Sequence, residues 1–274
     1  MNAFFVMIRK QLAESKWFLG VATVLLFGLG WLGVFMTVKI EARMRDRDPA
    51  GGLRRMAFRN FGGSAMDFSS TAIEVMLWNH PFIMLPLIVW AIARASGAPA
   101  GEVAKGTADL TLSRPVSRAS YLGAQVVVST LGLAVLAGAL LLGNRVGSQF
   151  NTVETPPNWV SLARTAGNLA ALGVAIYGFT LIFSAVDSVQ WRPSLIGSGF
   201  ALISFILFVI SNIPSLDDWK WLEHYSIFKA YQPVEVAVTG ETLAFNASVL
   251  CAIGLIGIVL SFLAFQWRDI PSNS

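Results

Sequence analysis

Residues 101–107, Gly-Glu-Val-Ala-Lys-Gly-Thr, come nearest in this sequence to a phosphate-binding motif. A nucleotide-binding loop needs a lysine between its second glycine and the Ser or Thr, so that the ammonium reaches the β- and γ-phosphates. Here Gly106 is followed directly by Thr107, and a long apolar run precedes the motif where a strand would be needed. We therefore expect no ATP binding by this chain itself.

The histidines and the glycine-flanked serine do not form a catalytic arrangement either. His80 and His224 lie at opposite margins of apolar runs, without Cys, Asp or Glu at the spacing of metal ligands. An intramembrane serine nucleophile at Ser198 would need a histidine inside another apolar run, and no run interior contains one. We expect no catalytic residue, no cofactor and no metal, and interpret Gly197 and Gly199 as helix-packing residues.

The composition is that of an integral membrane protein. Of the 274 residues, 55% are hydrophobic and only 13% are charged, whereas about 25% are charged in soluble domains. The net charge of +4 suits contact with anionic lipid headgroups better than with nucleic acid. We therefore expect the lipid bilayer as a partner and no nucleic acid.

Six apolar runs have the length that a helix needs to cross about 30 Å of hydrocarbon. Because a backbone in lipid must satisfy its own hydrogen bonds, the runs predict an all-α polytopic membrane protein. The expected spans are 17–38, 78–98, 122–143, 161–186, 194–213 and 243–267. We treat residues 1–274 as a single transmembrane domain. Pro81 and Pro86 predict a kink in the second span.

The segments outside these runs carry the polar residues. Residues 1–16 place apolar side chains at helical spacing and predict an interfacial helix, with a frayed, charged N-terminus as the alternative. Residues 39–77 form a long Arg-rich loop whose role stays open. Residues 144–160 predict an irregular loop. Residues 214–242 predict an aromatic segment that dips back into the interface or packs on helix ends.

The span interiors contain no ionisable residue, which argues against a secondary transporter or a proton pump. Arg94, near the end of the second span, is expected to snorkel toward the headgroups. Small residues at regular spacing predict helix contacts, within the chain or between subunits. They are Ala134, Gly138, Gly167, Ala170 and Ala171. Any energy for transport would have to come from a partner.

Residues 101–121 have helical content between the second and third spans. Val103, Thr107 and Leu110 recur at helical spacing, and Pro115 disfavours helix at the residue before it. These features predict a short amphipathic helix that ends near Ser113. Such a helix is suited to docking in a groove of a partner, and a solvated loop explains the same residues equally well.

This segment resembles the ABC-2 family of ABC transporter permeases. The residues that carry the resemblance are Glu102, Gly106, Thr107, Leu110, Leu112, Ser113, Pro115, Val116, Ser117 and Arg118. Residues 8–14 are similar to the interfacial connecting helix of that family. Residues 265–270 resemble its common Arg-Arg-Asp-Ile ending, and the six-span layout covers the whole chain.

The resemblance implies the membrane-spanning subunit of an ATP-driven exporter. Residues 102–113 would be a cytoplasmic coupling helix seated on a separate ATP-binding subunit, which hydrolyses the ATP. Two such subunits would assemble with two permease subunits, as a homodimer or a heterodimer. The implied docking residues are Glu102, Val103, Gly106, Thr107, Leu110, Leu112, Ser113, Arg114, Pro115, Ser117 and Arg118. The charged ones would lie at the docking rim, with Val103, Leu110 and Leu112 in the groove.

Charge counting leaves the orientation open. With both termini inside, the inner segments carry nine Lys and Arg residues and the outer loops eleven. The resemblance implies cytoplasmic termini and a location in the cytoplasmic (inner) membrane. The alternative function is an ATPase-independent six-span assembly factor or membrane enzyme. The cargo stays open.

Overall fold

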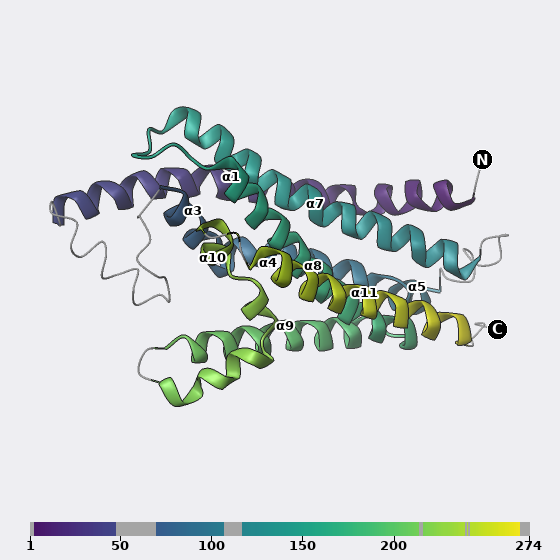
Figure 1. Cartoon of the computed structure of the whole chain (residues 1–274). Coiled ribbons are helices and arrows are strands. Elements are labelled where there is room, and N and C mark those ends of the chain that lie inside the picture. The colour runs from purple at the N-terminus through teal and green to yellow at the C-terminus, as the bar shows by residue number, and fades with distance from the viewer. Residues whose placement is uncertain are drawn as a thin grey trace.

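The computed structural model describes residues 3–47, 70–106, 117–213, 216–238, 240 and 242–268. Every regular element in these ranges is a helix (Figure 1). The longest helices form a bundle in which α1 (Ala3–Arg47) begins at the same end at which α11 (Leu243–Trp267) finishes. The all-α fold class predicted from the sequence is confirmed.

Five helices are long and apolar enough to cross a membrane. Besides α1 and α11 they are α7 (Arg118–Phe150), α8 (Trp159–Val186) and α9 (Trp191–Ser211). A sixth crossing results if the bent pair α3 (Ser70–Trp78) and α4 (Pro81–Gly97) counts as one span. Each of the six predicted spans coincides with one of these elements.

The pair α3 and α4 is bent by 47°. The break falls at Asn79 and His80, directly before Pro81. Proline has no N–H to donate to the preceding turn, so it favours the first position of a new helix. His80 caps that helix, since its Nδ1 accepts a hydrogen bond from the Phe82 N–H at 3.4 Å. The kink is confirmed at Pro81, whereas Pro86 lies inside α4 without ending it.

Helix α1 runs without interruption from Ala3 to Arg47. The expected boundary between an N-terminal helix of residues 1–16 and a span beginning at residue 17 is therefore not a helix end. The junction Leu-Ala-Glu-Ser-Lys (12–16) contains no glycine or proline and three strong helix formers, Leu12, Ala13 and Glu14. The N-terminal turns of α1, which carry the polar residues, therefore continue directly into the apolar part of the same helix.

Helix α7 also extends beyond its predicted end. Residues 144–150, expected in an irregular loop, are helical because they pack against α1. A Cβ at Gly147 would lie 3.1 Å from the Trp31 carbonyl oxygen, and one at Gly143 would collide with the Phe27 carbonyl oxygen. The two glycines let the backbones of α1 and α7 approach closely.

A second close crossing joins α8 and α11. A Cβ at Gly178 would collide with the carbonyl of Gly254, and one at Gly257 would collide with the backbone of Gly178. Gly138 and Gly167, which the sequence spacing predicted as helix contacts, have nothing within 4 Å of a Cβ in the described residues. The close crossings within the chain therefore use other glycines, and a contact between subunits at Gly138 and Gly167 stays a prediction.

Residues 216–238 fold back onto the bundle. They comprise η1 (Asp217–Tyr225), which packs on α9, then η2 (Ile227–Ala230), and α10 (Pro233–Val238), which packs on α3 and α8. Ser226 Oγ donates to the Ser204 carbonyl at 2.7 Å, and buried Tyr231 donates to the Trp78 carbonyl at 3.3 Å. The aromatic segment is therefore held against the bundle, as one of its two interpretations expected.

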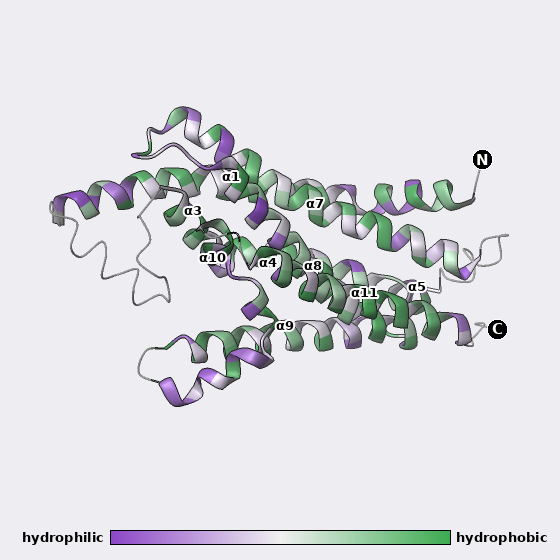
Figure 2. Cartoon of the chain, in the orientation of Figure 1, coloured by the Kyte–Doolittle hydropathy of each residue, from purple (hydrophilic) through white to green (hydrophobic). Residues whose placement is uncertain are grey.

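Hydrophobic residues cover the outside of the bundle as well as its core. Figure 2 shows them along the middle of the long helices, with hydrophilic residues concentrated toward the ends. Large apolar side chains such as Val24 of α1, Leu202 of α9 and Ile256 of α11 are exposed. A soluble protein rarely exposes so large an apolar surface, whereas lipid covers it in a membrane.

Candidate coupling site

The candidate site begins with α5 (Ala100–Ala104), a short helix that follows α4. Its first N–H, at Ala100, donates to Ser184 Oγ of α8 at 3.2 Å. The turn that follows α5 includes Gly106, whose φ of +67° is accessible to glycine at little cost. The Gly106 N–H donates to the Val103 carbonyl at 3.0 Å. The start of the predicted coupling segment is therefore fixed to the bundle.

Glu102 faces the interior and contacts α1. Glu102 is only 8% exposed. Its Oε1 accepts hydrogen bonds from Lys10 Nζ at 3.1 Å and from Gln11 Nε2 at 3.4 Å. The interaction with Lys10 is an ion pair. A buried carboxylate is costly unless a charge or several donors compensate it, so this pair fixes α5 to the N-terminal part of α1.

A second buried link continues from Gln11 to α4 and α7. Arg94 Nη2 donates to Gln11 Oε1 at 2.7 Å and to Gln125 Oε1 at 2.8 Å. Gln125 Nε2 donates in return to the Arg94 carbonyl at 2.7 Å. Arg94 was expected to snorkel toward the headgroups, but the two glutamine oxygens turn its guanidinium into the bundle. Both glutamines are buried and escaped the sequence analysis.

The other end of the segment is fixed to the end of α11. Ser117 caps α7, since its Oγ accepts from the Ser120 N–H at 3.1 Å. Arg118 Nη1 donates to the carbonyls of Phe265 at 3.1 Å, Gln266 at 3.3 Å and Arg268 at 2.6 Å. The last carbonyls of a helix lack partners within it, and a cation there is stabilised by the helix dipole.

Arg268 caps the end of α8 in the same way as Arg118 caps the end of α11. Its Nη1 donates to the Ala185 carbonyl at 3.2 Å. Burial lowers the pKa of the Arg268 guanidinium, while the Asp187 carboxylate opposes that shift and Arg118 adds to it. The ends of α7, α8 and α11 are thus joined through two arginines.

The structure describes five of the eleven predicted docking residues. They are Glu102, Val103, Gly106, Ser117 and Arg118. The other six lie outside the described residues. They are Thr107, Leu110, Leu112, Ser113, Arg114 and Pro115. Glu102 and Arg118 were expected at a docking rim, but both bind within the chain. They attach the described residues on either side of 107–116 to the bundle, and docking to a partner stays a prediction.

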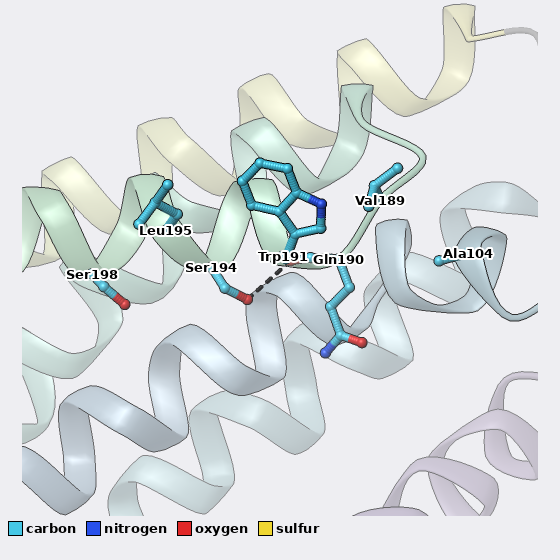
Figure 3. Close-up of a pocket in the computed structure, with 7 residues that line it drawn as sticks. All are labelled: Ala104, Val189, Gln190, Trp191, Ser194, Leu195 and Ser198. Atoms are coloured by element: carbon cyan, nitrogen blue, oxygen red, sulfur yellow. Dashed lines mark hydrogen bonds between the residues drawn. The ribbon is translucent and has the colours of Figure 1, made fainter.

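A groove of about 680 Å³ lies beside the end of α5 (Figure 3). Its lining residues are Ala104, Val189, Gln190, Trp191, Ser194, Leu195 and Ser198. Ser198, considered above as a nucleophile, lines this groove, and the neighbouring Gly197 packs closely against Thr180 of α8. The helix-packing interpretation therefore holds for Gly197, whereas Gly199 has open space beside it.

Comparison with models of known protein families and with curated proteins finds no match for this chain. Among the described residues, no group of three His, Cys, Asp or Glu side chains is arranged to hold a metal ion.

Proposed function

We propose that this chain is the membrane-spanning subunit of an ATP-driven transporter of the ABC-2 type. It forms the translocation pathway, and residues 102–113 transmit the motion of a separate ATP-binding subunit. The complex contains two ATP-binding subunits and two permease subunits, identical or different. Transport is outward, and both termini face the cytoplasm from the cytoplasmic membrane.

One structural observation supports the proposal beyond the motif itself. The two charged residues that flank the segment are each attached to a different long helix, Glu102 to α1 and Arg118 to the end of α11. A force on residues 107–116 therefore pulls on both helices at once. A solvated linker between two spans needs no such attachment at either end.

The buried links give this force a route into the bundle. From Glu102 it reaches Gln11, and from Gln11 it reaches Arg94 of α4 and then Gln125 of α7. Hydrogen bonds to charged groups are among the stronger polar interactions. A displacement of α5 would therefore be passed to α1, α4 and α7 together.

Co-purification with ATP turnover as the readout tests the docking. The double variant Leu110→Ala/Leu112→Ala removes the apolar groove contacts that we assign to the segment, without touching its attached ends. The tagged chain, purified from its native membrane, is expected to retain an ATP-hydrolysing subunit, and the variant to lose most of that activity. The matched control is Leu255→Ala/Leu263→Ala, which truncates two exposed leucines of α11 and leaves ATP turnover unchanged.

Equal ATP turnover in the wild type and in the Leu110/Leu112 variant would overturn the docking. A chain that is stable and active without any nucleotide-binding partner would favour the alternative of an assembly factor or a membrane enzyme.

The orientation has a separate test. A topology reporter inserted at Asp109 is expected to report a cytoplasmic location, as is one fused at the N-terminus. An external location of Asp109 would contradict the coupling assignment, whatever the co-purification shows.

A further inference from the structure

Glu74 of α3 and Asn144 of α7 form a buried pair at the end of the bundle away from α5. Asn144 Nδ2 donates a hydrogen bond to Glu74 Oε2 at 3.3 Å. Glu74 is 1% exposed and Asn144 is completely buried. Glu74 belongs to the stretch 39–77 that the sequence predicts as a loop before the second span, so a carboxyl group inside the bundle was not expected.

The second oxygen of each side chain has no hydrogen-bond partner among the described residues. These atoms are Glu74 Oε1 and Asn144 Oδ1. Both are acceptors when the carboxyl group is ionised, so they cannot satisfy each other. Buried polar atoms without a partner are rare, and each one requires an explanation.

A single proton supplies the missing donor. A neutral carboxylic acid carries one O–H donor beside its remaining acceptor oxygen. When the acid carbonyl accepts from the amide N–H, the acid O–H can donate to the amide oxygen, and the two groups close a ring of two hydrogen bonds. The bond between Asn144 Nδ2 and Glu74 Oε2 would be one half of that ring, and the two unpartnered oxygens would supply the acceptor and the protonated donor of the other half.

Glu41 of α1 shows what an ionised carboxylate receives in the same region. Its Oε1 accepts from Ser70 Oγ at 2.5 Å, and its Oε2 accepts from the Glu154 N–H at 3.1 Å. Each oxygen of Glu41 thus has a donor. Two nearby carboxylates in a poorly hydrated site do not both ionise readily, and Glu74 is the one with fewer donors.

Four other charged or titratable side chains on elements around α3 have contacts elsewhere. Arg45 of α1 pairs with Glu154, and the Arg145 guanidinium of α7 lies 4.5 Å from the Trp159 ring. Arg164 of α8 lies beside Gly240, and His80 caps α4. Glu235 of α10 adds a further carboxyl group. Among the described residues, no ion pair reaches Glu41 or Glu74.

We propose that Glu74 binds a proton on Oε1 and that the resulting O–H donates a hydrogen bond to Asn144 Oδ1, so that α3 and α7 share a proton-binding site. The proton comes from the aqueous phase, and the carboxylate becomes a neutral acid with no other bond changed. Loss of the proton leaves a charge with a single donor, which favours movement of α3 toward water. Since α3 is one half of the broken span, the site links proton binding to the break at Asn79 and His80. This inference does not depend on the proposed function.

Infrared spectroscopy of the full chain in lipid nanodiscs tests the site. A protonated carboxyl group gives a C=O stretch that is separate from carboxylate bands and shifts in D2O. At neutral pH the wild type is expected to show this band, Glu74→Gln to lose it, and the matched control Glu41→Gln to keep it. Asn144→Leu is expected to move the band to higher frequency, because the amide hydrogen bonds are lost.

Four outcomes would overturn the proposal. They are a wild-type spectrum in which Glu74→Gln removes no protonated band, loss of the band in Glu41→Gln, an unshifted band in Asn144→Leu, and a band that appears only when alkali cations are removed. The last outcome would assign the site to a bound cation. If Glu74→Gln fails to fold, as judged by circular dichroism, the spectra of the wild type, Glu41→Gln and Asn144→Leu still decide the question.

Discussion

The two ends of the bundle hold their buried polar groups in different ways. At the end formed by the first turns of α1, by α5 and by the last turn of α11, the charged side chains have charged or multiple partners (Figure 1). We call this the termini end. At the opposite end, Glu41 and Glu74 are buried with only neutral donors among the described residues.

This difference indicates how each end responds to change. Lys10, Arg94 and Arg118 at the termini end bind fixed acceptors, which produces a rigid joint between helices. At the opposite end, the balance of donors depends on whether Glu74 carries a proton. One end therefore joins its helices through fixed polar contacts, whereas the polar contacts of the other end would change with the protonation of Glu74.

Arg118→Ala is expected to give the largest effect. The variant removes the guanidinium that donates hydrogen bonds to three carbonyl oxygens at the end of α11. Hydrogen bonds from a charged donor contribute about 1.5–3 kcal/mol each to the free energy of unfolding. Since Arg118 is partly exposed, we expect a loss of about 3 kcal/mol in the free energy of unfolding. Unfolding in mixed detergent and SDS micelles, followed by circular dichroism, measures it.

Arg118→Lys is the matched control. It keeps the charge but loses the planar fork that reaches several carbonyls, so an intermediate loss is expected. Equal stability of wild type and Arg118→Ala would mean that the end of α11 is held by other contacts.

Glu41→Ala is expected to give the next largest effect, at the opposite end. It leaves the Ser70 hydroxyl and the Glu154 N–H without their acceptor, and a buried donor without a partner costs about 1–3 kcal/mol. We expect a loss of about 2 kcal/mol by the same unfolding measurement. The comparison variant Ser70→Ala leaves Glu41 its other donor but also removes the acceptor of the Thr155 N–H and hydroxyl, so a loss of similar size is expected. A larger loss in Ser70→Ala would show that Glu41 is not the centre of this cluster.

The candidate membrane-spanning helices were predictable because each depends on a run of apolar residues. The helix ends were not, because they depend on tertiary contacts. Gly147, a loop signal by itself, lies inside α7 since it allows close approach to Trp31 and Val34. Residue 16 was expected to separate two helices, but no local breaker is present there, and α1 continues.

The position of the candidate site in the chain was predictable, but the contacts that its residues make were predictable only in part. The motif located α5 and Arg118, but no pattern in the sequence showed that Glu102 turns inward to Lys10 and Gln11. Gln11 and Gln125 are separated by more than a hundred residues along the chain, and only the fold brings them to Arg94. Glu74 was missed because α3 extends the second span beyond its apolar run.

Lys10→Met tests how much the ion pair between Lys10 and Glu102 stabilises the termini end. The variant keeps the length of the side chain and removes the ammonium that pairs with Glu102 at 3.1 Å. Gln11 remains as a donor to the carboxylate, so we expect a loss of about 1 kcal/mol, within the range for a partly exposed pair. Most of the loss should persist in high salt, because a partly buried pair is screened much less than an exposed one. Complete disappearance in high salt would show that water reaches Glu102.

Arg45→Ala is expected to give the smallest effect and completes the comparison. Arg45 pairs with Glu154 at the opposite end, but its side chain is 67% exposed. Exposed pairs contribute about 0–1 kcal/mol and are screened by salt, so we expect a change below about 0.5 kcal/mol that vanishes in high salt. Arg192→Ala is the matched control at the termini end, because Arg192 forms a similarly exposed pair with Asp187 at 3.6 Å. If Arg45→Ala costs as much as Glu41→Ala, the loop that carries Glu154 is held by its surface charge. The buried carboxylates would then not be the feature that distinguishes the opposite end.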